Sequence, residues 1–329
     1  MTASASRKGF TLVELLVVTG LIASLLGLVV VGMRSNGSDA SQTRRSAQAL
    51  ASAFLATQSR AFGSPTGAGV IIDPAGVQGV VVSAALMHPL ITGSVSGMPP
   101  SDPWVSGTTI TFAPDNAEVL DLVHGYRIML SSNVTSGSTA PVSPNSTWLA
   151  FTPLTSNSAT IQLRSAVGQT TQNTSWPKNT APYASIARYP SLASPIAAME
   201  KSVAVDLRNS GVGNDPTTSF GQLHNKGAVA VTFDRSGVVA EVMQNVLASG
   251  VRSVDPQPPQ QPIYFLIAPR ADIDNAAVNV LSNPNNVWVT VFPGTGRTAV
   301  SANIAQTGTD ATALRAARAN ATLGIPIGK

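Results

Sequence analysis

Near its N-terminus the chain carries a long apolar segment. Residues Gly9–Met33 form an apolar run that is preceded by the basic pair Arg7 and Lys8. At about 1.5 Å per residue, a helix of about 25 residues reaches about 37 Å, more than the roughly 30 Å core of a bilayer. The pattern therefore predicts a membrane-spanning helix, which satisfies its backbone polar groups within the segment. Glu14 is the one charged residue inside the run: it either snorkels to the headgroups or has a functional role.

After Arg34 the apolar positions change to an amphipathic helical pattern. Apolar residues recur at helical spacing, and no proline occurs before Pro65; these residues are Ala47, Leu50, Ala51, Phe54, Leu55 and Phe62. We predict one long helix over residues 10–62, with 10–33 as the transmembrane part and filament stem. The second part is expected to bury its apolar stripe, from Ala47 to Leu55, against a β-sheet. Two separate helices, divided near residues 32–37, are the alternative.

From Gly67 onward the pattern changes to the period of two that is typical of strands. Seven candidate strands precede residue 210: 69–72, 80–82, 108–112, 126–130, 148–151, 160–163 and 203–207. The stretches 131–146 and 168–195 are rich in Ser, Thr, Asn and Pro and are predicted to be loops or a poorly ordered insertion. The sequence thus predicts a β-rich domain over residues 63–329, with a loop-rich insertion at about 88–200.

The C-terminal part has clearer strand signals. Two hairpins are predicted, one over 228–243 with a turn at Asp234–Gly237 and one over 287–300 with a turn at Pro293–Arg297. A single strand over 263–267 lies between them. The alanine-rich stretch 309–323 predicts a short surface helix that is loosely attached. The expected fold class is α+β, with the long helix packed on an antiparallel sheet.

The string Gly9-Phe10-Thr11-Leu12-Val13-Glu14, after a short basic leader and before an apolar run, resembles the type IV prepilin signature of type IV pilins and type II secretion pseudopilins. The resemblance implies that a prepilin peptidase removes the leader, residues 1–9, between Gly9 and Phe10, and that Phe10 is then N-methylated. It also implies that Glu14 pairs with the N-terminal amine of a neighbouring subunit during filament assembly. An ammonium and a carboxylate are tolerable when buried together, whereas either one alone is strongly penalised.

The basic residues before the apolar run predict an orientation. Arg7 and Lys8 favour a cytoplasmic N-terminus, which leaves the C-terminal domain in the periplasm as part of a single-pass protein of the bacterial inner membrane. A cleavable secretory signal peptide fits less well, because the run is too long and no small-x-small site follows it. A plain signal anchor is a further alternative. The expected partners are the prepilin peptidase, other pilins or pseudopilins and the inner-membrane secretion platform.

Two stretches of the C-terminal hairpins carry a second resemblance. Residues 231–237, VTFDRSG, and 289–297, VTVFPGTGR, resemble the soluble domain of H-type minor pseudopilins and the FimT-like pilin group. This implies a pilin-like fold. Members of that group are usually about half as long, and the segment from about His88 to Pro195 has no counterpart in them.

Charge and cysteine content exclude several classes of protein. The formal charge is +4, and loss of Arg7 and Lys8 with the leader leaves (20 − 2) − 16 = +2, too little to indicate a nucleic-acid partner. The chain has no cysteine, which rules out disulfides, zinc thiolates and a cysteine nucleophile.

The sequence offers no site for catalysis, a cofactor or a metal. Its three histidines, His88, His124 and His224, are far apart and lack metal-ligand spacing. Ser175 and Lys178 match S-x-x-K, but Pro177 breaks the helical turn that would join them. The G-x-G at 211–213 has no third glycine and predicts a loop. Four acidic residues lack the spacing of calcium ligands, namely Asp102, Asp115, Asp121 and Asp234.

The sequence is compatible with three functions. The first is a filament subunit of a type II secretion system or type IV pilus, which supports protein secretion. The second is a membrane-tethered, exported binding module that uses the prepilin pathway without a filament role. The third is an exported hydrolase. No residues in the sequence support this function, so we expect that the protein is not an enzyme.

Overall fold

The computed structural model of the chain describes residues 39–75, 78–97, 109–115, 126–131, 149–153, 160–164, 183–223, 227–248, 251–257 and 259–324. Within these residues, the chain is mostly antiparallel β-structure with few helices, as the α+β prediction requires. The predicted stem, residues 10–33, lies outside them. The described part of the N-terminal helix covers residues 39–61, which agrees with the second half of the predicted helix.

The larger β-structure is a ten-stranded antiparallel sheet. Its strands are β1 (Ala68–Ala75), β2 (Gln78–Leu86), β9 (Ser191–Ala198), β10 (Val203–Val212), β11 (Val229–Phe233), β12 (Val239–Ala248), β13 (Val251–Gln257), β14 (Ile263–Pro269), β15 (Val287–Val291) and β16 (Thr298–Ala302). Their order is β13-β12-β11-β1-β2-β10-β14-β15-β16, and β9 also pairs with β2. The predicted hairpins are confirmed as β11–β12 and β15–β16, and the predicted strand at 263–267 is confirmed as part of β14.

Short helices connect or cover these strands. They are η1 (Pro216–Thr218), α2 (Phe220–Leu223), α3 (Arg270–Asp274), η2 (Val280–Ser282) and α4 (Ala311–Thr322).

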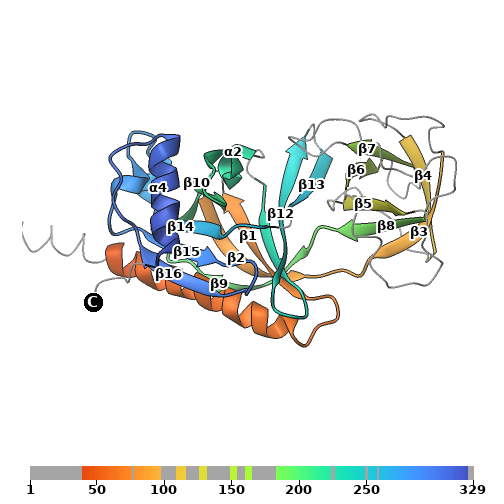
Figure 1. The fold of residues 1–329 in the computed structure, drawn as a ribbon, viewed down its shortest axis with the longest axis horizontal. Coiled ribbons are helices and arrows are strands. Elements are labelled where there is room, and N and C mark those ends of the chain that lie inside the picture. The colour runs from red at the N-terminus through yellow and green to blue at the C-terminus, as the bar shows by residue number, and fades with distance from the viewer. Residues whose placement is uncertain are drawn as a thin grey trace, which may run out of the picture.

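Both faces of the central strands are covered. Every residue of β11 and β15 is buried, and so is β14 from Ile263 to Ala268. Because alternate residues point to opposite faces, such burial requires a layer on each side. Phe265 shares one hydrophobic core with Phe54 of the N-terminal helix, whereas Leu266 shares a second core with Leu314 of α4. Figure 1 shows the N-terminal helix running along the sheet, and α4 standing at one end of the molecule.

The predicted stripe of the N-terminal helix is confirmed at four positions and wrong at the fifth. Ala47, Leu50, Ala51 and Phe54 are buried, and the Phe54 ring stacks on Phe265 with centroids 5.4 Å apart. Leu55 is 47% exposed. The reason is geometric: one helix face meets the sheet, and Leu55 lies about 40° beyond Ala51 around the axis, past the edge of that face.

The segment predicted as a loop-rich insertion contains a closed barrel. Its strands are β3 (Ile91–Ser96), β4 (Thr109–Pro114), β5 (Tyr126–Ser131), β6 (Leu149–Pro153), β7 (Thr160–Arg164) and β8 (Tyr183–Arg188). They close in the order β3-β4-β7-β6-β5-β8, and Figure 1 shows the barrel at the end of the molecule opposite α4. The predicted strands at 108–112, 126–130, 148–151 and 160–163 are confirmed as β4, β5, β6 and β7. The predicted loop at 168–195 is wrong for β8 of the barrel and for most of β9, which belongs to the sheet. Gly, Ala and Ser make up half of β3 and half of β8, which dilutes the β-branched and aromatic residues that indicate a strand.

The C-terminal helix α4 is firmly packed, which corrects the prediction of a loosely attached helix. Ala313, Leu314, Ala317, Arg318 and Ala321 are buried. Asp310 caps its N-terminus by accepting a hydrogen bond from the Ala313 amide at 2.9 Å. Alanine-rich faces suit close packing on a sheet, because the helix backbone can approach the strands.

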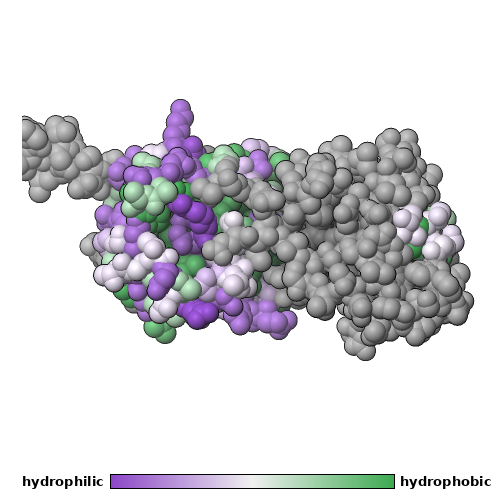
Figure 2. Space-filling model, turned by 90° about the horizontal axis from the view of Figure 1, so that it is seen from above, coloured by the Kyte–Doolittle hydropathy of each residue, from purple (hydrophilic) through white to green (hydrophobic). Residues whose placement is uncertain are grey.

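On the face shown in Figure 2, the coloured surface is mostly hydrophilic to intermediate, and hydrophobic residues occupy small areas.

Candidate functional site

The residues that the sequence predicts for processing and assembly, Gly9, Phe10 and Glu14, lie outside the described part of the chain. Among the helices that the structure describes, none is long and apolar enough to cross a membrane.

The end of the N-terminal helix is tied to the turns of both predicted hairpins. Gln58 Nε2 donates hydrogen bonds to the carbonyl oxygens of Gly237, at 2.8 Å, and Thr295, at 2.9 Å. We call this contact, with Phe62 and Gly296, the helix–turn junction. The sequence places Gln58 on a face away from the sheet, so its role was missed. The turns belong to the two stretches that carry the resemblance to H-type pseudopilins.

Glycine is required on both turns of the helix–turn junction. Gly237 has φ of 77° and Gly296 has φ of 65°, a region that other residues rarely adopt. A Cβ atom on Gly237 would lie 2.5 Å from the Phe62 ring, and one on Gly296 would overlap Gln58 and the Gly237 carbonyl. The two turns therefore lie so close to the end of the helix that a side chain at either glycine would clash.

The β11–β12 turn is fixed by its own carboxylate. Asp234 Oδ1 accepts hydrogen bonds from the Ser236 amide, the Ser236 hydroxyl and the Val238 amide. Partial burial works to raise the pKa of Asp234, but these hydrogen bonds outweigh it and lower the pKa from its ordinary value. The turn is thus most stable with Asp234 ionised.

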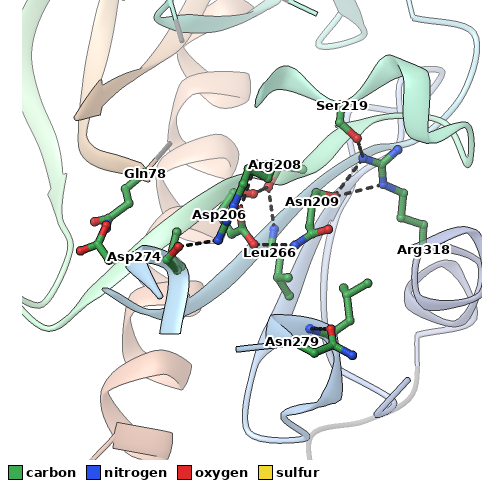
Figure 3. A network of polar contacts seen from close by, with 12 residues as sticks. Gln78, Asp206, Arg208, Asn209, Ser219, Leu266, Asp274, Asn279 and Arg318 are labelled. Atoms are coloured by element: carbon green, nitrogen blue, oxygen red, sulfur yellow. Dashed lines mark hydrogen bonds and ion pairs between the residues drawn. The ribbon is translucent and has the colours of Figure 1, made fainter. Parts of the chain in front are cut away.

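A second cluster of polar side chains lies between β10 and α4 (Figure 3). Arg318 of α4 is fully buried, and its guanidinium donates five hydrogen bonds. The acceptors are the carbonyl oxygens of Asn209, which accepts two, Gly213 and Asp215, and the hydroxyl of Ser219. A guanidinium has five N–H donors, so all are used within the chain and none is left for a ligand.

The electrostatics of this cluster follow from burial. Burial lowers the pKa of Arg318 to about 10, which still leaves the group charged at neutral pH. Its guanidinium carbon lies 5.9 Å from the centroid of the Tyr264 ring, an arrangement that suits a cation–π contact. Burial raises the pKa of Tyr264, whose hydroxyl bonds to Thr322 at 2.5 Å. The cluster therefore holds α4 and the segment 209–219, from the end of β10 through η1, in one arrangement.

Asp206 of β10 is a fully buried carboxylate beside this cluster (Figure 3). It accepts hydrogen bonds from the Arg208 amide at 3.0 Å and from Asn209 Nδ2 at 2.6 Å, and Arg208 Nε lies 3.6 Å away. Burial nevertheless raises the pKa of Asp206 above its ordinary value. Nearby, Gln78 Nε2 donates to Asp274 Oδ1, which links β2 to α3.

A groove of about 470 Å³ opens beside the cluster. Its walls come from the end of β10, from residues 276–281 and from the start of α4. Arg208 is its one cationic side chain, and it already pairs with Asp206 and donates to the Ile273 carbonyl. Asp310 is its one carboxylate and is engaged as the cap of α4. The groove therefore brings no nucleophile and base together.

The other residues that the sequence raised are placed only in part. His88 Nε2 lies 2.7 Å from Ser191 Oγ, and Asp115 Oδ2 accepts a hydrogen bond from Thr92 Oγ1 at 2.9 Å. Outside the described residues lie His124, His224, Ser175, Lys178, Asp102 and Asp121. Over the described ranges, no group of three or more His, Cys, Asp or Glu side chains could hold a metal ion.

Comparison with known proteins identifies the N-terminal segment alone. The family model described as the prokaryotic N-terminal methylation motif matches residues 4–30. No curated protein and no solved structure matches the chain significantly. The matched segment contains Gly9, Phe10 and Glu14, so the chain carries a type IV prepilin-like signature, as exported and membrane-anchored pilin-like proteins do.

Proposed function

We propose that this protein is a pilin or pseudopilin subunit of a type II secretion system or a type IV pilus-like filament. The observation that carries the proposal is the match of the N-terminal methylation motif to residues 4–30. In this proposal, a prepilin peptidase cuts between Gly9 and Phe10, Phe10 is methylated, and residues 10–33 form a transmembrane helix that becomes the filament stem. The N-terminus is cytoplasmic, and the domain after Arg34 is periplasmic.

The architecture supports this proposal in one respect. The helix that the structure describes from residue 39 packs its buried stripe on an antiparallel sheet. We propose that this helix continues into the stem, residues 10–33, and so joins the stem to the exported domain. The helix–turn junction fixes the end of that helix to both C-terminal hairpins. These are the hairpins whose sequences resemble H-type minor pseudopilins, and we propose that subgroup and a pilin-like fold for the chain on this ground.

Mass spectrometry of the mature N-terminus tests the proposal. We expect a chain that begins at Phe10 and carries an added methyl group. Gly9→Val should retain the leader, because a bulky side chain would clash where the backbone enters the peptidase closely, whereas Ser6→Val within the leader should still be processed. A mature chain that begins elsewhere would show that the prepilin pathway does not process this protein.

A second candidate function is a tethered binding module that is exported through the prepilin pathway and does not enter a filament. The barrel β3–β8 favours it, because a closed barrel at the far end of the domain is a unit that the sheet does not need for its own strand pairing. Co-purification separates the two functions: a filament subunit is recovered with other pilins or pseudopilins from cross-linked membranes, and a tethered module is recovered without them.

A further inference from the structure

The chain leaves the sheet for the barrel and returns to the sheet at one place. The last residue of β2, Leu86, pairs with the first residue of β9, Ser191. Between this pair and the barrel there are only two short connections, residues 87–90 and 189–190. His88 Nε2 and Ser191 Oγ, which are 2.7 Å apart, join one connection to the start of β9. The barrel thus stands where a hairpin of β2 and β9 would have its turn.

The barrel also has its own apolar interior. Six large apolar side chains from its strands are at most 3% exposed, namely Ile91, Val95, Ile110, Phe112, Ile128 and Ile186. None of these residues belongs to the cores that the sheet forms with the N-terminal helix and with α4. The described core residues therefore divide into separate sets, with the division at the two short connections.

Closure of the ring makes the barrel self-sufficient in backbone pairing. Each of its six strands pairs with two others, so it has no free strand edge and borrows no strand from the sheet. β13, the edge strand of the sheet, lies against β5 and β6 without entering their strand order. A contact of this kind positions the barrel but does not complete its fold.

We propose that the barrel formed by β3 to β8 is an independently folding module, inserted in place of the β2–β9 turn, which unfolds without loosening the helix and sheet. The inference goes beyond the proposed function, because it holds for a filament subunit and for a tethered module alike.

Differential scanning calorimetry of the processed full-length protein tests the inference with two matched variants. Phe112 of the barrel and Phe265 of the sheet are both fully buried. Phe112→Ala should lower one unfolding transition by on the order of 10 °C or more and leave the other in place. Phe265→Ala should lower the other transition alone.

Each outcome decides the question. A wild-type protein with one transition that splits into two in Phe112→Ala supports the module as well, since the unchanged part then belongs to the sheet. A single transition that both variants lower together would show one cooperative unit and overturn the inference. If the barrel of Phe112→Ala does not fold at all, hydrogen exchange provides the test instead. The amides of β14 and β15 should then keep the protection that they have in the wild type. Loss of protection at these amides would refute the module. Cleavage at Gly9 is measured separately, so failure of the proposed function is distinguishable from failure of this inference.

Discussion

The side-chain amide of Gln58 donates a hydrogen bond to the carbonyl oxygen of Gly237 at 2.8 Å, across 179 residues of sequence. The same nitrogen donates to the carbonyl oxygen of Thr295 at 2.9 Å. One helical residue thus bonds to two hairpin turns whose strands lie apart in the sheet order, with β15–β16 at one end and β11–β12 toward the other. The turns also meet directly, since the Val239 amide donates to the Pro293 carbonyl oxygen at 3.0 Å, and Gln58 adds the end of the helix to this contact.

Gln58→Ala should lower the free energy of unfolding by about 1–2 kcal/mol, because two hydrogen bonds to carbonyl oxygens are lost and water replaces them only in part. Gln48→Ala is the matched control, since Gln48 lies on the exposed face of the same helix. Urea denaturation of both variants measures the difference. Equal stability of the two variants would mean that the turns do not depend on Gln58.

Arg318→Met should be much more destabilising, by at least about 3 kcal/mol, because it leaves several buried carbonyl oxygens without a donor. Arg315→Met on the exposed side of α4 is the control and should have little effect. Thermal unfolding compares the two. A small effect of Arg318→Met would show that water satisfies the segment 209–219 as well as the guanidinium does.

The buried carboxylate Asp206 should give stability a distinctive pH dependence. Since burial raises its pKa in the folded protein above the ordinary 3.8, the stability it contributes is complete below 3.8 and is lost as the pH rises through the raised value. The stability of the wild type relative to Asp206→Asn should therefore fall as the pH rises above about 3.8.

Asp234→Asn is the control with the opposite sign, because the pKa of Asp234 is lowered and its contribution is lost as the pH falls. Urea unfolding at several pH values measures both variants against the wild type. A difference between the wild type and Asp206→Asn that stays constant with pH would contradict a raised pKa of Asp206.

Glu14→Ala should be inserted and cleaved normally, since alanine keeps helix propensity and raises apolarity. Its incorporation into a filament should fall, because the buried amine of Phe10 then lacks a partner. Cross-linking to partner pilins in membranes, beside a secretion assay, measures the loss, and Thr19→Ala in the same apolar run serves as the control. Normal cross-linking and secretion in Glu14→Ala would favour the tethered module.

The sequence was most informative where structure is encoded locally. The β11–β12 hairpin was predictable because Asp234 and Gly237 form the turn with hydrogen bonds between neighbouring residues. The buried helical stripe was predictable because the period of a helix fixes which side chains share a face. Leu55 shows the limit, since the width of that face depends on the sheet that it meets.

Contacts between segments that are distant in the sequence could not be predicted from it. Arg315 and Arg318 look alike within an alanine-rich helix, yet Arg318 is buried because the carbonyl oxygens of a segment about 100 residues earlier surround it. Four of the six barrel strands, β4 to β7, were predicted as separate strands, whereas β3, β8 and the closure of the ring were not. Ring closure buries residues such as Ile110 and Ile186 by pairing strands that are distant in the sequence.

The pairing of Leu86 with Ser191 has an evolutionary consequence. Two residues that face each other across a strand pair can be joined by a tight two-residue turn, so the barrel could be gained or lost without changing the register of a single strand in the sheet. Related chains can then carry a different insertion at this place, or none. The contacts of the N-terminal helix, the helix–turn junction and Arg318 are kept in either case. Selection can therefore change the barrel without changing the part of the molecule formed by the helix and the sheet.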